Sequence, residues 1–480
     1  MRNGRGSALE GLLTAGLDEG KSRFTLEDGA RIAVVGGGPA GSFFSYFMLG
    51  MAQAVDLEIE LDIYEPRHFS HAGPAGCNHC GGIISESLVQ ILAAEGINLP
   101  ATVVQRGIAS YVVHTDEDAV RIESPVREQR IASVFRGNGP RGGADTSRES
   151  FDGYLLAMAA ERGARVVRRL VSGVRWVDGA PRLEHPGAEG ATYDLIVLAV
   201  GVNSNLTQLV RADSGPAPAA STRTTRTYIC AFQADQQLVQ DVLGNSMHVF
   251  LPTLPRLEFA ALVPKGEYLT LVVLGDDIDQ ELISDFLDSA AVRRCLPKQC
   301  VPMVCNCAPL INLRGADRPY ADRLVLIGDS GVTRLYKDGI GAAYRTAKSA
   351  AETAVLHGVA AEDFERHYRP VCRSIEADNT IGKLIFGTTH LFKVSSHARR
   401  AALRMAAREQ GRKGRRRMSS VLWNLFTGSA TYREILKDTL HPAFGAGFVW
   451  NLAASLRPGR RELKGTGGAH AQGHARPVVR

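Results

Sequence analysis

The chain has 480 residues, of which 45% are hydrophobic and 22% charged, and it carries a formal net charge of +6. This is the composition of a globular protein long enough for two packed cores, without an apolar run of about 18 residues that would span a membrane. Residues 1–29 lack the continuous apolar core of a secretory signal, and eight cysteines are too few for a disulfide scaffold. We therefore expect a cytoplasmic protein, free or peripheral to the inner face of the membrane.

The first strong signal is a strand, a tight turn and a helix within residues 31–50. A β-branched run at 32–35 predicts the strand, and Gly36, Gly38 and Gly41 follow in the pattern G-x-G-x-x-G. Such glycines permit a tight turn, let a diphosphate approach the backbone and let the helix pack on the strand. A second predicted strand ends at Glu65, where an acid would bond a ribose hydroxyl. These features together predict a dinucleotide site.

Three later segments indicate which dinucleotide. They are 146–167 with Arg148-x-x-Phe151-Asp152, the buried strand and glycine turn at 193–205, and 323–351, where a strand ends at Gly328-Asp329 and a helix opens at Gly339. An acid at the tip of a parallel strand can hydrogen-bond a polyol chain. The helix N-terminus beyond it can stabilise negative charge on a flavin ring.

Together these segments resemble the FAD-dependent oxidoreductases that include p-hydroxybenzoate hydroxylase, and among them the geranylgeranyl reductases. The resemblance covers roughly residues 30–390. It implies an α/β fold with a discontinuous Rossmann-like FAD-binding domain, an inserted antiparallel β substrate domain and a C-terminal helical region. It implies FAD as the cofactor. The electron donor stays open between NAD(P)H and a ferredoxin-like carrier, because Val200 replaces the aspartate of the family's Ala-Asp-Gly-x-x-Ser motif.

The resemblance also implies the residues that hold FAD. They are Gly36, Gly38, Pro39, Ala40, Gly41, Glu65, Arg67, Gly81, Gly82, Arg148, Gly201, Gly328, Asp329, Gly339, Ile340 and Gly341. Among them, Arg148 would lie near the flavin cleft and Asp329 near the ribityl–pyrophosphate region. The backbone amides at 339–341 would face the isoalloxazine. We assign no metal ligand.

Short β-rich runs with proline and glycine between them predict the inserted sheet. The FAD-binding domain is expected at 30–102, 141–215 and 316–360, and the substrate domain at 103–140 and 216–315. The C-terminal helical region is expected at 361–456, with flexible termini at 1–29 and 457–480. The run FAALVPKGEYLTLVVLG at 259–275 resembles the reductases' substrate-sheet motif, with Phe259, Ala261 and Leu262 at its aromatic positions. The resemblance therefore implies an apolar cavity.

Two cysteine groups leave their chemistry open. In GPAGCNHCGGII at 73–84, Cys77 and Cys80 can form a metal site, a redox dithiol or a loop of ordinary thiols. Cys80-Gly81-Gly82 fits the Cys-Gly loop beside the flavin in the resembled reductases, so Cys80 is the catalytic candidate. The second group, CLPKQCVPMVCNC at 295–307, holds Cys295, Cys300, Cys305 and Cys307, which can ligate a metal or cluster, form a reversible disulfide or be buried thiols.

The C-terminal region combines basic and aromatic residues. Nine Lys or Arg lie between 399 and 417, against the single acid Glu409. Aromatics follow: Trp423, Phe426, Phe444, Phe448 and Trp450. Segment 399–456 therefore predicts either contact with an anionic membrane surface or a helical lid on the flavoprotein. Nucleic-acid binding is not expected, because no recognition module accompanies the basic run.

We interpret the sequence as an FAD-dependent oxidoreductase that reduces carbon–carbon double bonds of a small apolar, isoprenoid-type substrate by hydride transfer. One alternative is a flavin-dependent monooxygenase or halogenase. The other is an electron-relay flavoprotein that acts with a protein partner, an electron carrier.

Overall fold

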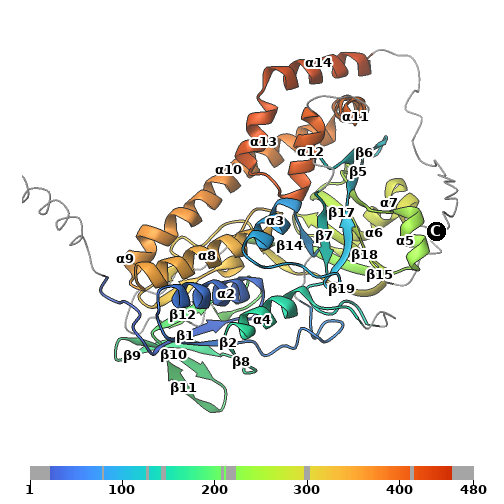
Figure 1. Ribbon diagram of the computed structural model, residues 1–480. Coiled ribbons are helices and arrows are strands. Elements are labelled where there is room, and N and C mark those ends of the chain that lie inside the picture. Colours follow the sequence, from blue (N-terminus) through green and yellow to red (C-terminus); the bar gives the residue numbers. More distant parts are fainter. Residues whose placement is uncertain are drawn as a thin grey trace, which may run out of the picture.

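The computed structural model describes residues 22–77, 81–125, 129–141, 147–206, 210–211, 223–296, 303–410 and 416–456. In Figure 1 an α/β unit lies at one end, a large β-sheet lies beside it, and the C-terminal helices run along both. The segment before the first strand is anchored, since the backbone oxygen of Phe24 accepts a hydrogen bond from the backbone N–H of Val359 at 2.7 Å.

The centre of the α/β unit is a six-stranded sheet in the order β21-β22-β12-β1-β2-β8. Its strands are β1 (Ala30–Val35), β2 (Ile59–Tyr64), β8 (Arg165–Val167), β12 (Leu195–Leu198), β21 (Tyr320–Ala321) and β22 (Leu324–Leu326). All neighbours pair in parallel except β21 and β22. Val34 lies between Ile63 and Val197 in this register. The parallel order places the carboxyl ends of β1, β2, β12 and β22 at one edge.

Helices and a second sheet cover the two faces of this sheet. Ile32 and Val34 point to the side of α2 (Pro39–Ala54), α4 (Phe151–Glu161) and α8 (Gly339–Leu356). Ala33 and Val35 point to a four-stranded sheet made of β9 (Gly173–Val177), β10 (Ala180–His185), β11 (Ala188–Thr192) and β13 (Val210–Arg211). Buried alanines on α8 let it lie close to α2, as Figure 1 shows.

The large sheet has seven strands in the order β19-β15-β18-β17-β16-β5-β6. They are β5 (Ser110–His114), β6 (Ala119–Glu123), β15 (Tyr228–Gln233), β16 (Ser246–Phe250), β17 (Leu257–Lys265), β18 (Tyr268–Gly275) and β19 (Met303–Cys307). The expected antiparallel pairing holds except between β5 and β16, which pair in parallel. These two strands come from segments more than a hundred residues apart, so no hairpin turn constrains their relative direction.

Two smaller sheets lie next to the large one. A three-stranded sheet contains β3 (Ile83–Ile84), β7 (Ile131–Val134) and β4 (Val104–Ile108), in that order. A two-stranded sheet pairs β14 (Thr224–Arg226) with β20 (Leu310–Asn312). Helix α3 (Glu86–Ala94) follows β3 directly and begins at Ser85, whose hydroxyl accepts a hydrogen bond from the N–H of Leu88.

Different helices cover the two faces of the seven-stranded sheet. On one face, Phe250 and Leu262 pack with α5 (Gln236–Val242), α6 (Gln280–Asp288) and α7 (Ala290–Cys295). On the other face, Tyr111 and Phe259 pack with helices of the C-terminal region. Of the expected substrate-cavity residues, Phe259 and Ala261 therefore face the C-terminal helices, whereas Leu262 faces the opposite layer.

The C-terminal region is helical from residue 361 to residue 456, apart from short connections and the undescribed residues 411–415. Its elements are α9 (Ala361–Asp363), η3 (Phe364–Tyr368), α10 (Arg369–Val394), α11 (Ser396–Gln410), α12 (Arg417–Thr427), α13 (Tyr432–Thr439) and α14 (Pro442–Leu456). Across the described residues, no helix is both long and apolar enough to cross a membrane.

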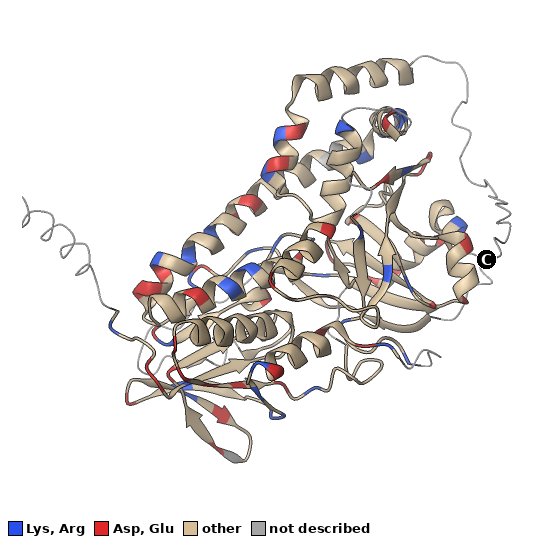
Figure 2. Ribbon diagram, viewed as in Figure 1, with Lys and Arg blue, Asp and Glu red and all other residues tan. Residues whose placement is uncertain are grey.

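The C-terminal aromatics divide into two groups. Trp423 is fully buried and stacks on Tyr111 with 4.7 Å between ring centroids, and Phe426 is also buried. These two side chains therefore pack against the seven-stranded sheet and are not exposed to an external surface. Trp450 on α14 is 71% exposed, and the helix carries no charged side chain, as Figure 2 shows.

Candidate functional site

The glycine turn after β1 leaves no space for side chains. Gly36 has φ +106°, and a Cβ there would lie 2.5 Å from the carbonyl oxygen of Ala199 at the end of β12. A Cβ at Gly41 would collide with the carbonyl oxygen of Gly36. Gly38 is the N-cap of α2 and offers no side-chain cap, and Pro39 occupies the first turn. The amides at this helix N-terminus are therefore oriented for an anion.

Glu65 follows β2 at the same edge of the sheet and is 2% exposed. Its carboxylate accepts hydrogen bonds from the backbone N–H of Gly37 at 3.0 Å and from the backbone N–H of Arg67 at 3.0 Å. The Arg67 side chain also pairs with it, with Nε 3.1 Å from Oε1. The expected ribose acid is thus already hydrogen-bonded to the glycine turn.

The turn after β22 comes to the same edge. Gly328 has φ +59°, and a Cβ there would lie 2.7 Å from the Cβ of Ala40 on α2. The carboxylate of Asp329 lies beside Gly339, since a Cβ at Gly339 would be 3.9 Å from its Oδ1. Burial raises the pKa of Asp329, while a hydrogen bond with Thr333 and the charge of Arg136 act in the opposite direction.

The turn after β12, with Val200 in place of an acid, has two structural roles. Gly201 has φ +71°, so this position favours glycine. Asn203 exchanges two hydrogen bonds with the backbone of Leu310 on β20, at 2.9 and 3.3 Å. The turn therefore joins the α/β unit to the small two-stranded sheet.

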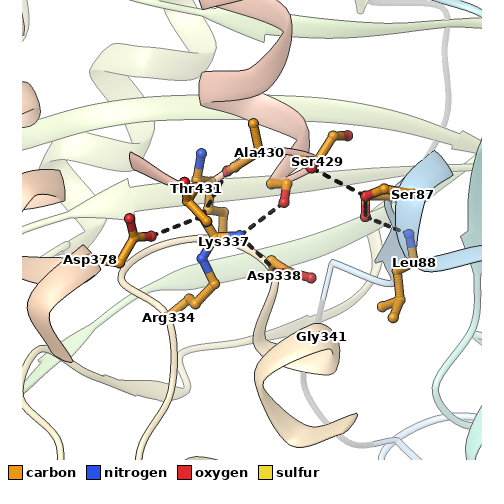
Figure 3. A network of polar contacts seen from close by, with 12 residues as sticks. Ser87, Leu88, Arg334, Lys337, Asp338, Gly341, Asp378, Ser429, Ala430 and Thr431 are labelled. Atoms are coloured by element: carbon orange, nitrogen blue, oxygen red, sulfur yellow. Dashed lines mark hydrogen bonds and ion pairs between the residues drawn. The ribbon is translucent and has the colours of Figure 1, made fainter. Parts of the chain in front are cut away.

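The N-terminus of α8 is held by a buried ionic network, which Figure 3 shows. Arg334 donates to the carboxylates of Asp338 at 2.9 Å and Asp378 at 3.3 Å. It also donates to the carbonyl oxygens of Gly428 and Ala430, both at 2.9 Å. Because Asp378 lies on α10 and the two carbonyls follow α12, the C-terminal region fixes the start of α8.

Two further contacts tighten this network. Asp338 caps α8 in a left-handed conformation with φ +54°, and a Cβ at Gly341 would collide with its carboxylate. Lys337 donates from Nζ to the carbonyl oxygen of Asn424 at 2.7 Å. Burial lowers the pKa of Lys337 well below its ordinary value, and the charge of Arg334 lowers it further. The expected glycines at 339 and 341 are thus part of a rigid helix start.

Buried cations line the junction between the α/β unit and the seven-stranded sheet. The Arg148 side chain is 4% exposed, pairs with Glu267 at 3.2 Å and lies over the rings of Phe135 and Tyr268. Lys265 is 2% exposed, and its Nζ lies 5.0 Å from the centroid of the Phe135 ring. The two positive charges therefore share one aromatic ring.

The glycine pair after the Cys77 loop reaches this junction. A Cβ at Gly82 would lie 2.8 Å from Nζ of Lys265, and Gly82 has φ +64°. A Cβ at Gly81 would lie 3.0 Å from the Val272 side chain on β18. Cys80, the catalytic candidate, lies outside the described residues.

The second cysteine group is divided by the fold. Cys305 and Cys307 lie on the edge strand β19, whereas Cys295 ends α7, and Cys300 lies outside the described residues. Cys295 is a buried free thiol that contacts His248 rather than the thiols of β19. The structure thus gives no support to a four-thiol metal site, and the partners that Cys295 does have were not predicted.

Other features were missed from the sequence. Arg136 and Asp152 form a bidentate ion pair, with Nη2 2.9 Å from Oδ2 and Asp152 fully buried.

A pocket of about 250 Å³ opens between α3, α12 and α13; it is lined by Glu86, Pro125, Arg417, Ser420, Trp423, Asn424 and Asp438. Glu86 accepts from Trp423 Nε1 at 2.7 Å, and its other oxygen has no partner among the described residues. Only the fold brings these distant residues together.

Comparisons with known proteins support this architecture. The structure is similar to a flavoprotein/dehydrogenase from Cytophaga hutchinsonii, with a TM-score of 0.57 and 13% identity, over 89% of this chain and 98% of that one. It is similar to the flavin-dependent brominase Bmp2, with a TM-score of 0.53 and 14% identity, over 88% of this chain and 93% of that one. It is similar to halogenase PltM in complex with phloroglucinol and FAD, with a TM-score of 0.54 and 11% identity, over 89% of this chain and 91% of that one.

The chain has the fold of these flavoproteins. The likeness extends over nearly the full length of both chains, so it includes the α/β unit, the large sheet and C-terminal helices. No family model matches the chain, and no curated protein matches it either.

Proposed function

We propose that the protein is an FAD-dependent oxidoreductase. The observation that carries this proposal is the convergence of three features at one edge of the parallel sheet. These are the glycine turn of 36–41, the acid Glu65 and the Gly328-Asp329 turn beside the start of α8. Ligands of open α/β sheets bind outside the carboxyl ends of the strands, which is this edge.

The chain's own residues would divide the work of holding FAD. The amides at the start of α2 would bind the diphosphate, and Glu65 would exchange its bond with Gly37 for one with a ribose hydroxyl. Asp329 would bond the ribityl region, and the amides of 339–341 would face the flavin ring. When bound, FAD supplies hydride-transfer chemistry that no side chain can supply.

We further propose that the reaction reduces a carbon–carbon double bond of a small apolar, isoprenoid-type substrate. The layer between the seven-stranded sheet and the C-terminal helices supports this proposal. In it, Phe259 packs on Phe386 with 6.3 Å between centroids and on Phe426 with 5.6 Å. Such a layer would receive an apolar chain and exclude water from the reacting atoms. The charges of Arg148 and Lys265 would offset negative charge at the junction.

A flavin-dependent halogenase is the second candidate. The observation that favours it is the similarity to a brominase and a halogenase at TM-scores above 0.5. The two candidates make different demands, since a halogenase needs oxygen and halide whereas a reductase works without either.

Flavin analysis and an anaerobic assay test these proposals in turn. Heat-released cofactor from the purified protein is identified by chromatography, and FAD is the expected species. The protein is then reduced without oxygen by NADPH or by a reduced ferredoxin, and polyprenyl lipids are added. A lipid product that gains two hydrogen atoms supports the reductase. The protein is also tested in air with halide and an aromatic substrate. Halogenation of that substrate, without reduction of the lipid, would replace the reductase with the second candidate. Electron transfer to a carrier protein with neither product would indicate a relay.

We also propose that α14 contacts an anionic membrane surface. Val449, Trp450 and Leu456 give this helix an exposed apolar side. Basic residues of the neighbouring α11 provide charge complementary to such a surface, although Arg399 is buried in an ion pair with Glu117 and does not contribute. Arg404 and Arg408 donate to α14 at 3.0 and 2.8 Å and hold it in place.

A further inference from the structure

Three side chains from distant parts of the chain converge on the far side of the seven-stranded sheet. They are His114 at the end of β5, His248 in β16 and Cys295 at the end of α7. Nε2 of His114 lies 3.0 Å from Nδ1 of His248, which lies 3.1 Å from Sγ of Cys295. The third side of the triangle, from Cys295 Sγ to His114 Nε2, measures 3.8 Å. All three residues are buried.

This triangle has the dimensions of a metal coordination face. In a tetrahedral zinc site the Zn–N distance is about 2.0–2.1 Å and the Zn–S distance about 2.3 Å, which places neighbouring ligand atoms roughly 3.3–3.6 Å apart. The three observed separations, between 3.0 and 3.8 Å, bracket those values. One cation can therefore contact all three atoms with little movement of the side chains.

Hydrogen bonding alone satisfies the cluster poorly. A neutral imidazole nitrogen either donates one proton or accepts with one lone pair. Nδ1 of His248 nevertheless lies within reach of both other ligand atoms, so one of its two contacts cannot be a well-directed hydrogen bond. Nδ1 of His114 is buried and has no hydrogen-bond partner among the described residues. A cation would instead use a lone pair from each converging atom.

The surroundings favour a fixed, water-poor site. The His114 ring stacks on Phe250 with 4.8 Å between centroids, and Phe250 packs against Phe286 of α6. Among the described residues, the charges that act on the two imidazoles include those of Arg121 and Arg294, both positive. A bound cation therefore depends on the thiolate of Cys295 for negative charge, and the thiol proton would leave to solvent on binding.

We propose that His114, His248 and Cys295 bind one Zn²⁺ ion. Two imidazoles and one thiolate suit a borderline-soft metal, whereas Mg²⁺ and Ca²⁺ prefer oxygen ligands. The ion would fix α7 to strands β5 and β16. The cluster lies on the face that packs with α5–α7, so this proposal does not rest on the proposed flavin chemistry.

Metal analysis of the full-length protein tests the site. The zinc content of protein purified without chelator is measured by elemental mass spectrometry, and about one zinc per chain is expected. Replacement of zinc by Co²⁺ should produce a thiolate-to-cobalt absorption band in the near ultraviolet. His248→Ala and Cys295→Ser should lose both signals. Cys372→Ser, which removes a buried thiol elsewhere, should keep both.

A second measurement covers variants that fold poorly. Thermal unfolding of the wild-type protein is followed after chelation and after return of Zn²⁺ or Mg²⁺. The midpoint should rise with Zn²⁺ and not with Mg²⁺, because a ligand that binds only the folded state stabilises it. Wild-type protein that holds no zinc after incubation, with no cobalt band and an unchanged midpoint, would overturn the proposal. Retention of copper in preference to zinc would overturn the choice of metal.

Discussion

The two ends of the proposed FAD site are built differently. At the adenine end, the turn of 36–41 depends on glycines that leave no room for a Cβ, and its contacts, with Ala199 after β12 and Glu65 after β2, lie within the α/β unit. At the flavin end, the start of α8 is held by Arg334, whose partners come from α10 and from the chain after α12. The first end depends on backbone geometry within the α/β unit, and the second on a buried arginine that is bound to a carboxylate and two carbonyl oxygens of the C-terminal region.

The adenine end should show the largest effect on cofactor binding. Gly41→Val places a branched side chain against the carbonyl oxygen of Gly36, which moves α2 away from β1. We expect FAD affinity to fall by at least about 100-fold, or about 2.7 kcal/mol. Flavin absorbance titration measures this change. Gly387→Ala, on an exposed part of α10 with no atom near the added Cβ, is the matched control. Equal affinity in both variants would show that the turn does not contact the cofactor.

A substitution at the flavin end should have its largest effect on the free energy of unfolding. Arg334→Met removes a buried guanidinium from the half-buried carboxylates of Asp338 and Asp378, and we expect a loss of about 3–5 kcal/mol in the free energy of unfolding. Urea unfolding measures it. Arg314→Met breaks an exposed pair with Asp317 and should cost less than about 1 kcal/mol. If the two losses are similar, the C-terminal region does not brace α8.

Asp329 lies between the two ends and should show opposite effects on binding and stability. Burial raises its folded-state pKa above the unfolded value, so its charge costs stability above the folded pKa, and this cost is absent below the unfolded pKa. Asp329→Asn should therefore stabilise the FAD-free protein more at neutral pH than at pH about 4. It should also weaken FAD binding about tenfold, or about 1.4 kcal/mol. Thermal melts at both pH values and a flavin titration measure these effects; a uniform loss of stability would be inconsistent with them.

The smallest effect on the fold is expected at α14, outside both ends of the site. Trp450→Ser removes an exposed ring, so the free energy of unfolding should change by less than about 0.5 kcal/mol. Binding to vesicles that contain anionic lipid should nevertheless weaken in a sedimentation assay. Leu384→Ser, an exposed apolar position on α10, is the control and should bind as the wild type does. Equal binding by the wild type and both variants would show that Trp450 of α14 does not contact the membrane.

Residues set by local spacing were predictable from the sequence, whereas residues that act through contacts between distant parts of the chain were not. Gly36, Gly41 and Glu65 follow a local spacing, so their positions in the fold were predictable. Asn203 and Arg334 act through contacts with residues 94 to 107 positions away, which no spacing reveals. His114 and Cys295 are 181 residues apart, so local cysteine spacing could not indicate that Cys295 contacts two histidines. Trp423 and Phe426 matched an interfacial pattern equally well, but their burial depends on the seven-stranded sheet beneath them.

The most direct test of the proposed FAD site is a crystal structure determined from crystals of the protein soaked with FAD. We expect one FAD along the carboxyl edge of the six-stranded sheet. The diphosphate should lie at the start of α2 and the flavin ring at the start of α8, with Glu65 bonded to a ribose hydroxyl. Absence of flavin from well-ordered protein, or flavin bound away from this edge, would contradict it.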